Sequence, residues 1–179
     1  RPFSLTGRQH LVMTWGTPIE EPLEPLCDRF LSETSRYWQS WVKHCDVPPR
    51  YQNEVIRSAL ALKLHCFEDT GAIIAAMTTS IPESAGSGRT WDYRYCWLRD
   101  ASFTLRALVT NGYPFEAGAW REWLHRAVAG DPASLQILYG VAGERRLVEM
   151  ELPWLAGYEG SAPVRIGNAA SGQLQLDVY

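Results

Sequence analysis

The chain has 179 residues, enough for one domain with a substantial hydrophobic core. Its formal net charge of −3 offers no basic surface for nucleic acid, and no apolar run approaches the roughly 20 residues that span a bilayer. Aromatic residues make up 12 % of the chain and include eight tryptophans, which suits either a ligand groove or an ordinary core. We therefore expect neither a nucleic acid nor a membrane as a partner.

The cysteines and histidines show no pattern of a metal or redox site. Cys27, Cys45, Cys66 and Cys96 have no C-x-x-C spacing, and three of them fall in apolar helical patterns. Reduced core thiols are the simplest interpretation, and they are typical of a cytoplasmic protein. The four histidines are scattered, so we expect no metal and no organic cofactor.

The first 25 residues differ in character from the rest. Residues 8–16 form an apolar run with valine, threonine and tryptophan that glycine closes, which predicts a strand. Residues 17–25 carry three prolines among acidic residues and indicate a linker. We place a domain boundary there, with a β element before it and a helical body over residues 26–179.

Helical periodicity dominates the body. Apolar residues recur at helical spacing, with polar residues between them, over residues 26–45, 51–67, 101–110 and 115–130. Residues 70–83 are ambiguous, residues 131–140 and 144–161 have strand or turn character, and residues 168–179 open as a further helix. Successive helices joined by long loops predict an all-α layered or toroidal fold.

The segment from Thr90 to Phe103, TWDYRYCWLRDASF, combines features that rarely occur together. Four aromatic residues fall within seven positions, and Arg99 and Asp100 follow them directly. Aromatic faces beside hydrogen-bonding charges suit a pocket for a flat-faced, polar ligand.

Structural roles for the same residues remain open. Asp100 is a suitable N-cap for a helix that begins at Ala101. Arg99 could pair with Asp92 or Asp100, a contact of little energetic value if exposed. The alternation of Trp91, Tyr93 and Tyr95 with charged residues is typical of a half-buried strand, so we interpret these three aromatics as mostly structural.

Residues 90–101, TWDYRYCWLRDA, resemble a segment of the family 15 glycoside hydrolases, the glucoamylase-like and bacterial trehalase-like enzymes. Five further segments resemble the family in the same order: TSIPE, REWLHRAVAGDP, LQILYGVAGERRL, ELPWLAGYEGSAPVRIGNAA and QLQLDVY. The resemblance implies an (α/α)6 toroid, of which residues 26–179 would be a truncated first part. Residues 1–25 would be the end of a preceding β-sandwich domain and its linker.

The resemblance also implies an activity and a set of substrate-binding residues. Family members are exo-acting, inverting hydrolases of α-glucosides, so the expected substrate is a maltooligosaccharide or trehalose. Trp97 would lie beside the terminal glucose, with Arg99 and Asp100 on its hydroxyls. A second pocket loop is implied at Tyr158, Gly160, Ser161, Arg165 and Asn168.

The chemistry of a sugar agrees with these roles. A pyranose has a face of C–H groups, which suits an indole, and a rim of hydroxyls. Arginine donates hydrogen bonds and aspartate accepts them, so the two can bracket neighbouring hydroxyls. Charge-assisted hydrogen bonds of this kind contribute about 1.5–3 kcal/mol each.

No catalytic residue is nominated from the sequence. Inverting hydrolysis needs an acid and a base whose carboxyl groups lie about 6.5–9.5 Å apart. The resemblance implies two glutamates that lie later in the chain than Tyr179, so we expect the 179-residue chain alone to be inactive. We also expect it to associate with the rest of the same polypeptide or with a second copy through an open apolar face.

Two other functions remain open. The chain could belong to a non-catalytic sugar-binding or regulatory module of the same fold, or to a helical scaffold without a ligand. Substitution of Trp97 or Arg99 separates the scaffold from the others, because in a scaffold it would affect stability alone.

Overall fold

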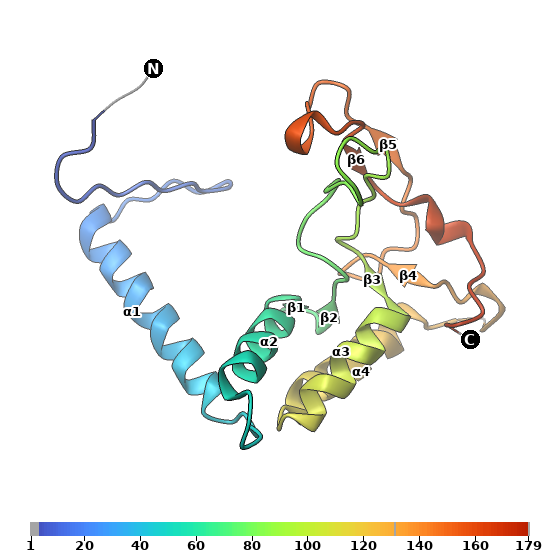
Figure 1. Ribbon diagram of the computed structural model, residues 1–179, viewed down its shortest axis with the longest axis horizontal. Helices are drawn as coiled ribbons and strands as arrows, with labels where there is room; N and C mark the ends of the chain where they lie inside the picture. The colour runs from blue at the N-terminus through green and yellow to red at the C-terminus, as the bar shows by residue number, and fades with distance from the viewer. Residues whose placement is uncertain (1–3, 131, 179) are drawn as a thin grey trace. The chain divides into compact units, whose positions relative to one another are not determined.

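The computed structural model describes residues 4–130 and 132–178, and the chain divides into two compact units, Arg1–His44 and Cys45–Tyr179 (Figure 1). The parts of the predicted domains that fall on residues 1–3 and on Tyr179 lie outside the described residues, as does Asp131. The domain boundary after residue 25 stays a prediction.

The first unit contains one long helix, α1 (Leu23–Val42), which confirms the helix predicted over residues 26–45. The helix begins directly after Pro22, and Glu24 in its first turn suits the positive end of the helix dipole. The strand predicted over residues 8–16 was wrong, because these residues are irregular. A strand needs a hydrogen-bonded neighbour, and no strand pairs with them in the described part of the chain.

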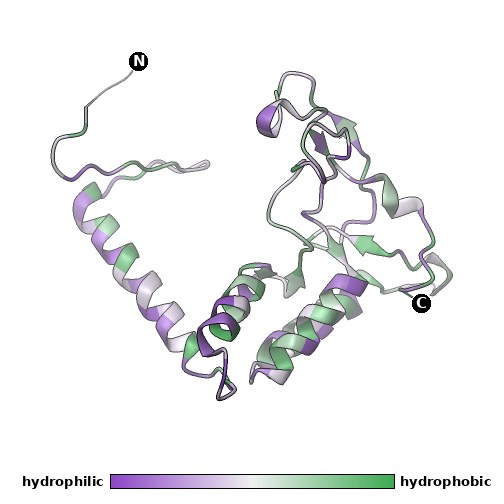
Figure 2. Ribbon diagram, viewed as in Figure 1, coloured by the Kyte–Doolittle hydropathy of each residue, from purple (hydrophilic) through white to green (hydrophobic). Residues whose placement is uncertain are grey.

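The second unit contains α2 (Gln52–Leu64), α3 (Leu98–Thr110) and α4 (Pro114–Ala127). Helices α3 and α4 lie side by side, joined by a turn in which Gly112 has a φ of 90° (Figure 1). Pro114 begins α4, a position where its missing N–H costs nothing. Hydrophobic and hydrophilic residues alternate along α3 and α4 in Figure 2, as expected of helices with one buried side.

The described residues also contain three antiparallel pairs of two-residue strands. β1 (Cys66–Phe67) pairs with β2 (Ala72–Ile73), β3 (Cys96–Trp97) with β4 (Leu138–Tyr139), and β5 (Met150–Glu151) with β6 (Arg165–Ile166). The ambiguous residues 70–83 therefore contribute a strand. The helix predicted over residues 168–179 was wrong, because a short 3-10 turn, η3 (Ala169–Gly172), is the helical structure there.

The core of the second unit lies on both sides of the β3–β4 pair. Residues Ala72, Cys96, Trp123, Ala127 and Tyr139 form one buried cluster, and Trp97, Ile137, Leu138 and Leu147 form another. Neighbouring residues of a strand point to opposite faces, so Cys96 and Trp97 anchor β3 in both clusters. Trp97 thus lies on a rigid part of the fold.

The helical prediction is confirmed in outline: the regular structure of residues 4–130 and 132–178 is mostly helical, with four α-helices and a few short strands. Closure into a toroid stays a prediction. All four cysteines are free thiols, as the sequence predicts. None of the described helices is both long and apolar enough to cross a lipid bilayer.

Candidate functional site

A cavity of about 630 Å³ lies beside the start of α3, where the chain passes from aromatic to charged residues. One part of its lining is aromatic and comes from the segment that the sequence singles out. The other part is polar and charged: Glu83, Arg89, Arg99, Glu149, Asn168, Gln173 and Gln175. The volume lies within the range of about 300–1,000 Å³ that small-molecule sites occupy.

The aromatic wall consists of Trp91, Tyr93 and Trp97. Trp97 is 5 % exposed, and its ring centroid lies 5.8 Å from that of Tyr93. The backbone behind this wall is fixed, because the amides of residues 75 and 76 donate hydrogen bonds to the carbonyls of residues 95 and 93. We interpreted Trp91 and Tyr93 as mostly structural, whereas the structure places both of them at the cavity. Tyr95 accepts a hydrogen bond from the Gly167 amide.

Arg99 brings a positive charge to the cavity. Its Nη1 donates to Asp177 Oδ2 at 2.8 Å and to Gln175 Oε1 at 3.0 Å. The hydrogen bond to Asp177 raises the pKa of Arg99 above its ordinary value, so the guanidinium stays a cation. Arg99 is about one-third exposed and lines the cavity.

Asp100 contacts Arg99 rather than capping a helix. The helix begins at Leu98 and Trp97 is the N-cap, so the predicted N-cap role of Asp100 was wrong. Asp100 instead lies in the first turn, where its charge suits the helix dipole, and it forms an ion pair with Arg99 at 3.3 Å. Asp92 pairs with Arg94 and not with Arg99. Asp100 is not among the described residues that line the cavity.

The second predicted loop contributes Asn168 to the cavity. Its buried side-chain amide donates to Asp92 O at 2.9 Å, and its oxygen accepts from the Ala170 amide. Tyr158 is 56 % exposed in η2 (Tyr158–Gly160), and Arg165 lies behind the aromatic wall; neither is among the described residues at the cavity. Substrate-binding roles for Asp100, Tyr158 and Arg165 stay predictions.

Sequence reasoning missed a polar edge formed by Gln173, Gln175 and Asp177. The two glutamines line the cavity, and Gln175 and Asp177 hold Arg99. The intervening Leu174 and Leu176 are 83 % and 90 % exposed. Residues 173–175 are irregular and residues 176–178 form a turn, in which the Val178 amide donates to Gln175 O at 3.0 Å. No local sequence signal marks these three side chains, because they meet Arg99 and the cavity only through the fold.

Among the described residues, two carboxylates line the cavity, and each contacts an arginine. Glu83 lies 2.7 Å from Arg89 Nε and accepts a hydrogen bond from the Tyr93 hydroxyl at 3.3 Å. Burial, followed by the nearby charge of Glu83, raises the pKa of Tyr93, which keeps its hydroxyl protonated. Glu149 accepts from the Ala169 amide and lies 3.5 Å from Arg165 Nε. Neighbouring residues of the wall thus hold both carboxylates.

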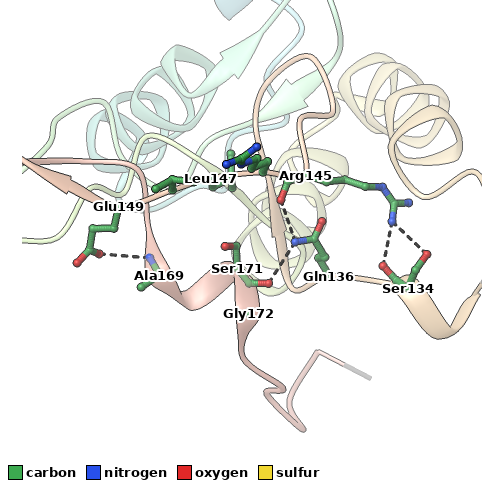
Figure 3. A pocket seen from close by; sticks show the side chains of 10 residues that line it. Ser134, Gln136, Arg145, Leu147, Glu149, Ala169, Ser171 and Gly172 are labelled. Carbon is green, nitrogen blue, oxygen red and sulfur yellow. Dashed lines mark hydrogen bonds between the residues drawn. The ribbon is translucent and has the colours of Figure 1, made fainter.

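A second cavity, of about 570 Å³, adjoins the first and shares Glu149 and Ala169 with it (Figure 3). In Figure 3, the Gln136 amide donates to Arg145 O at 3.0 Å and to Ser171 O at 3.1 Å. Arg145 in turn donates to the carbonyl and hydroxyl of Ser134. Trp97 and Arg99 line the first cavity and are not among the described residues that line the second, so we take the first cavity as the candidate site.

The described residues include no cluster of three or more histidine, cysteine, aspartate or glutamate side chains that could hold a metal ion. The described lining of the candidate site consists mainly of aromatic rings, amides and charged side chains.

Comparisons with known proteins place the whole cavity inside a family match. The family model for glycosyl hydrolases family 15 matches residues 49–179. A trehalase of Mycolicibacterium smegmatis is 41 % identical to the chain, over 94 % of this chain and 26 % of that protein. A trehalase of Thermoplasma acidophilum is 42 % identical, over 83 % of this chain and 25 % of its own length. Trehalase 2 of Sulfolobus acidocaldarius is 40 % identical, over 98 % of this chain and 30 % of its own length.

The chain thus spans less than a third of the length of each of these relatives. No solved structure matches it.

Proposed function

We propose that this chain, which belongs to the glycosyl hydrolases family 15, forms part of the terminal-glucose pocket of an inverting, exo-acting α-glucoside hydrolase. Trehalose is the proposed substrate, because several similar proteins are trehalases. Maltooligosaccharides share the same terminal glucose and are the alternative substrate class.

The observation that carries this proposal is the meeting of Trp97 and Arg99 in one cavity. An indole offers a flat apolar face to the C–H groups of a hexose, and a guanidinium offers forked donors to its hydroxyls. Gln173 adds a side-chain amide at the same cavity, and an amide both donates and accepts, as a hydroxyl requires. The Asn168 amide is held by Asp92 and Ala170 and shapes the wall of the cavity. The volume of about 630 Å³ lies within the range of about 300–1,000 Å³ that small-molecule sites occupy.

We assign this chain to sugar binding and not to proton transfer. Glu83 and Glu149, the carboxylates at the cavity, each contact an arginine, an arrangement that suits holding a wall in place. The acid and the base would be glutamates supplied by the rest of the protein, about 6.5–9.5 Å apart as inversion requires. In this proposal residues 26–179 are the first part of an (α/α)6 toroid, and residues 1–25 close a preceding β-sandwich domain.

Titration of the full-length protein with glucose tests the proposed pocket. Glucose is the expected reaction product, so the enzyme does not consume it during the measurement. Calorimetry would compare the unaltered protein with Arg99→Ala and with Arg106→Ala, an exposed arginine on the same helix. We expect Arg99→Ala to weaken glucose binding about tenfold or more, since each lost charge-assisted hydrogen bond contributes about 1.5–3 kcal/mol. Arg106→Ala should bind as the unaltered protein does.

Turnover of trehalose and of maltooligosaccharides by the same full-length protein then separates the remaining functions. Glucose binding with turnover supports the hydrolase. Glucose binding without turnover supports the non-catalytic sugar-binding module instead. Absence of glucose binding contradicts the pocket and leaves the helical scaffold.

A further inference from the structure

Arg165 lies behind the aromatic wall and contacts it directly. The carbon at the centre of its guanidinium lies 4.7 Å from the centroid of the Trp91 ring, over its face. Trp91 lines the cavity, whereas Arg165 is not among the described residues that do so. The side chain of Arg165 is 12 % exposed, so the cation is packed against the indole with little access to solvent.

Protein atoms surround the guanidinium of Arg165. Its Nη1 donates to Gly88 O at 3.0 Å and to Thr90 Oγ1 at 2.8 Å. Its Nη2 donates to Glu151 Oε1 at 3.4 Å. These acceptors lie before and after the indole, so the guanidinium ties the segment that carries Trp91 to strand β5.

The backbone of Arg165 is also fixed. Its amide donates to Ser80 Oγ at 2.7 Å, and its carbonyl accepts from Thr79 Oγ1 at 2.6 Å. Thr90, which receives the guanidinium, is fully buried and donates to Pro163 O at 2.6 Å. A cation held this firmly restricts the orientation of the ring that it covers.

Arg165 also reaches a second lining residue, Glu149. Its Nε lies 3.5 Å from Glu149 Oε1, an ion pair that falls short of hydrogen-bond geometry. The other carboxylate oxygen of Glu149 accepts from the Ala169 amide at 3.2 Å. Arg165 therefore connects an aromatic and an acidic residue of the cavity wall.

We propose that Arg165 is a positioning residue: it orients Trp91 and Glu149 at the cavity and does not itself contact the sugar. The inference rests on the proposed function, because it concerns the walls of that sugar pocket. It replaces direct sugar contact, the role that the family resemblance implies for Arg165.

A double-mutant cycle on the full-length protein tests this role. The variants are Arg165→Met, Trp91→Leu and both together, with Arg121→Met, an exposed arginine on α4, as the matched control. We expect Arg165→Met to raise the KM for trehalose about three- to tenfold, within the range of one lost cation–π contact, with a smaller change in kcat. The double variant should have the same KM as Trp91→Leu alone. If the increases in KM of the two single variants multiplied in the double variant, Arg165 would act independently of Trp91, and the proposal would be overturned.

A spectroscopic measurement tests the same role without a sugar. The emission of Trp91 is obtained as the difference between each protein and its Trp91→Phe counterpart. We expect Arg165→Met to shift this emission to longer wavelength and to increase its quenching by acrylamide, because the ring loses its cover. Unchanged emission and quenching would overturn the proposal, even if trehalose proves not to be the substrate. A protein that shows the shift but hydrolyses neither trehalose nor maltooligosaccharides would contradict the proposed function alone.

Arg165→Lys keeps the result interpretable if Arg165→Met does not fold. Lysine retains a cation but lacks the planar fork that reaches Thr90 and Glu151 together. The Trp91 emission should therefore shift in the same direction by a smaller amount. If Trp91 in the Arg165→Lys variant emitted like a fully exposed tryptophan, this would contradict the expectation that the lysine cation still covers the Trp91 ring.

Discussion

The Asp177 carboxylate receives a hydrogen bond of 2.8 Å from Arg99 Nη1 and so fixes the cation that lines the cavity. The two residues are 78 positions apart in the sequence. This contact joins the turn at residues 176–178 to the first turn of α3.

Asp177→Asn is expected to weaken glucose binding about two- to fivefold. The contact is partly exposed, with 57 % of the Asp177 side chain accessible, and exposed ion pairs contribute about 0.2–1 kcal/mol. Calorimetry on the full-length protein measures the change. Asp69→Asn, the same substitution at an exposed position, is the control. Equal affinities for the two variants would show that Asp177 does not orient Arg99.

Lys63→Met is expected to destabilise the protein by about 3–5 kcal/mol, because it removes the cation from a buried pair. Lys63 is 6 % exposed and its Nζ lies 3.0 Å from Oε1 of Glu116, which is 7 % exposed. Denaturant unfolding would compare this variant with Lys43→Met, which alters an exposed lysine. The double variant Lys63→Met/Glu116→Leu should recover much of the loss. A similar small cost for both lysines would contradict a buried ion pair.

Gly167→Ala is expected to destabilise the protein more than Gly86→Ala. Both glycines have a positive φ, of 79° and 73°, so both substitutions cost about 1–2 kcal/mol in backbone strain. A Cβ at Gly167 would also lie 1.9 Å from Val148 O, whereas Gly86 has open space around it. Thermal unfolding measures the difference. Equal losses would show that the close approach of residues 148 and 167 does not occur.

Burial of Cys96 is expected to make stability depend on alkaline pH. Burial raises the pKa of the Cys96 thiol from 9.0 to about 12, so the folded protein retains a proton that the unfolded chain releases. This contribution is fully present below about pH 9 and is lost as the pH rises through the folded pKa.

Urea unfolding of the unaltered protein and of Cys96→Val, at pH 7.5 and at pH 10.5, measures this dependence. The loss of stability between the two pH values should be smaller in the variant, which has no thiol to titrate. Equal losses in the two proteins would contradict a protonated, buried thiol at Cys96.

The helices could be predicted because their signals are local. Apolar residues recur at helical spacing along α1 and α2, and Pro114 marks the start of α4, so each helix was found within a few residues. The two-residue strands carry no comparable pattern, since a pair such as β3–β4 is defined by its distant partner. Residues 8–16 were predicted as a strand from their composition, but they are irregular. A strand-like composition does not form a strand without a neighbouring strand to pair with.

The part of the candidate site that lies within one short segment could also be predicted, because its signal is local. Trp97 and Arg99 stand two positions apart, so a single segment brings both to the cavity. Asp177 and Gln175 come to Arg99 only through the fold, and no local signal connects them. The family resemblance indicated a loop that includes Arg165, but its place behind Trp91 depends on contacts with Gly88 and Thr90, more than 70 positions earlier.

A crystal structure of the full-length protein with glucose tests the central claim most directly. The account predicts a hexose in the cavity with its C–H face against the Trp97 indole and a hydroxyl within hydrogen-bond distance of the Arg99 guanidinium. A glucose molecule bound at another place, with Trp97 and Arg99 both free of it, would contradict the account.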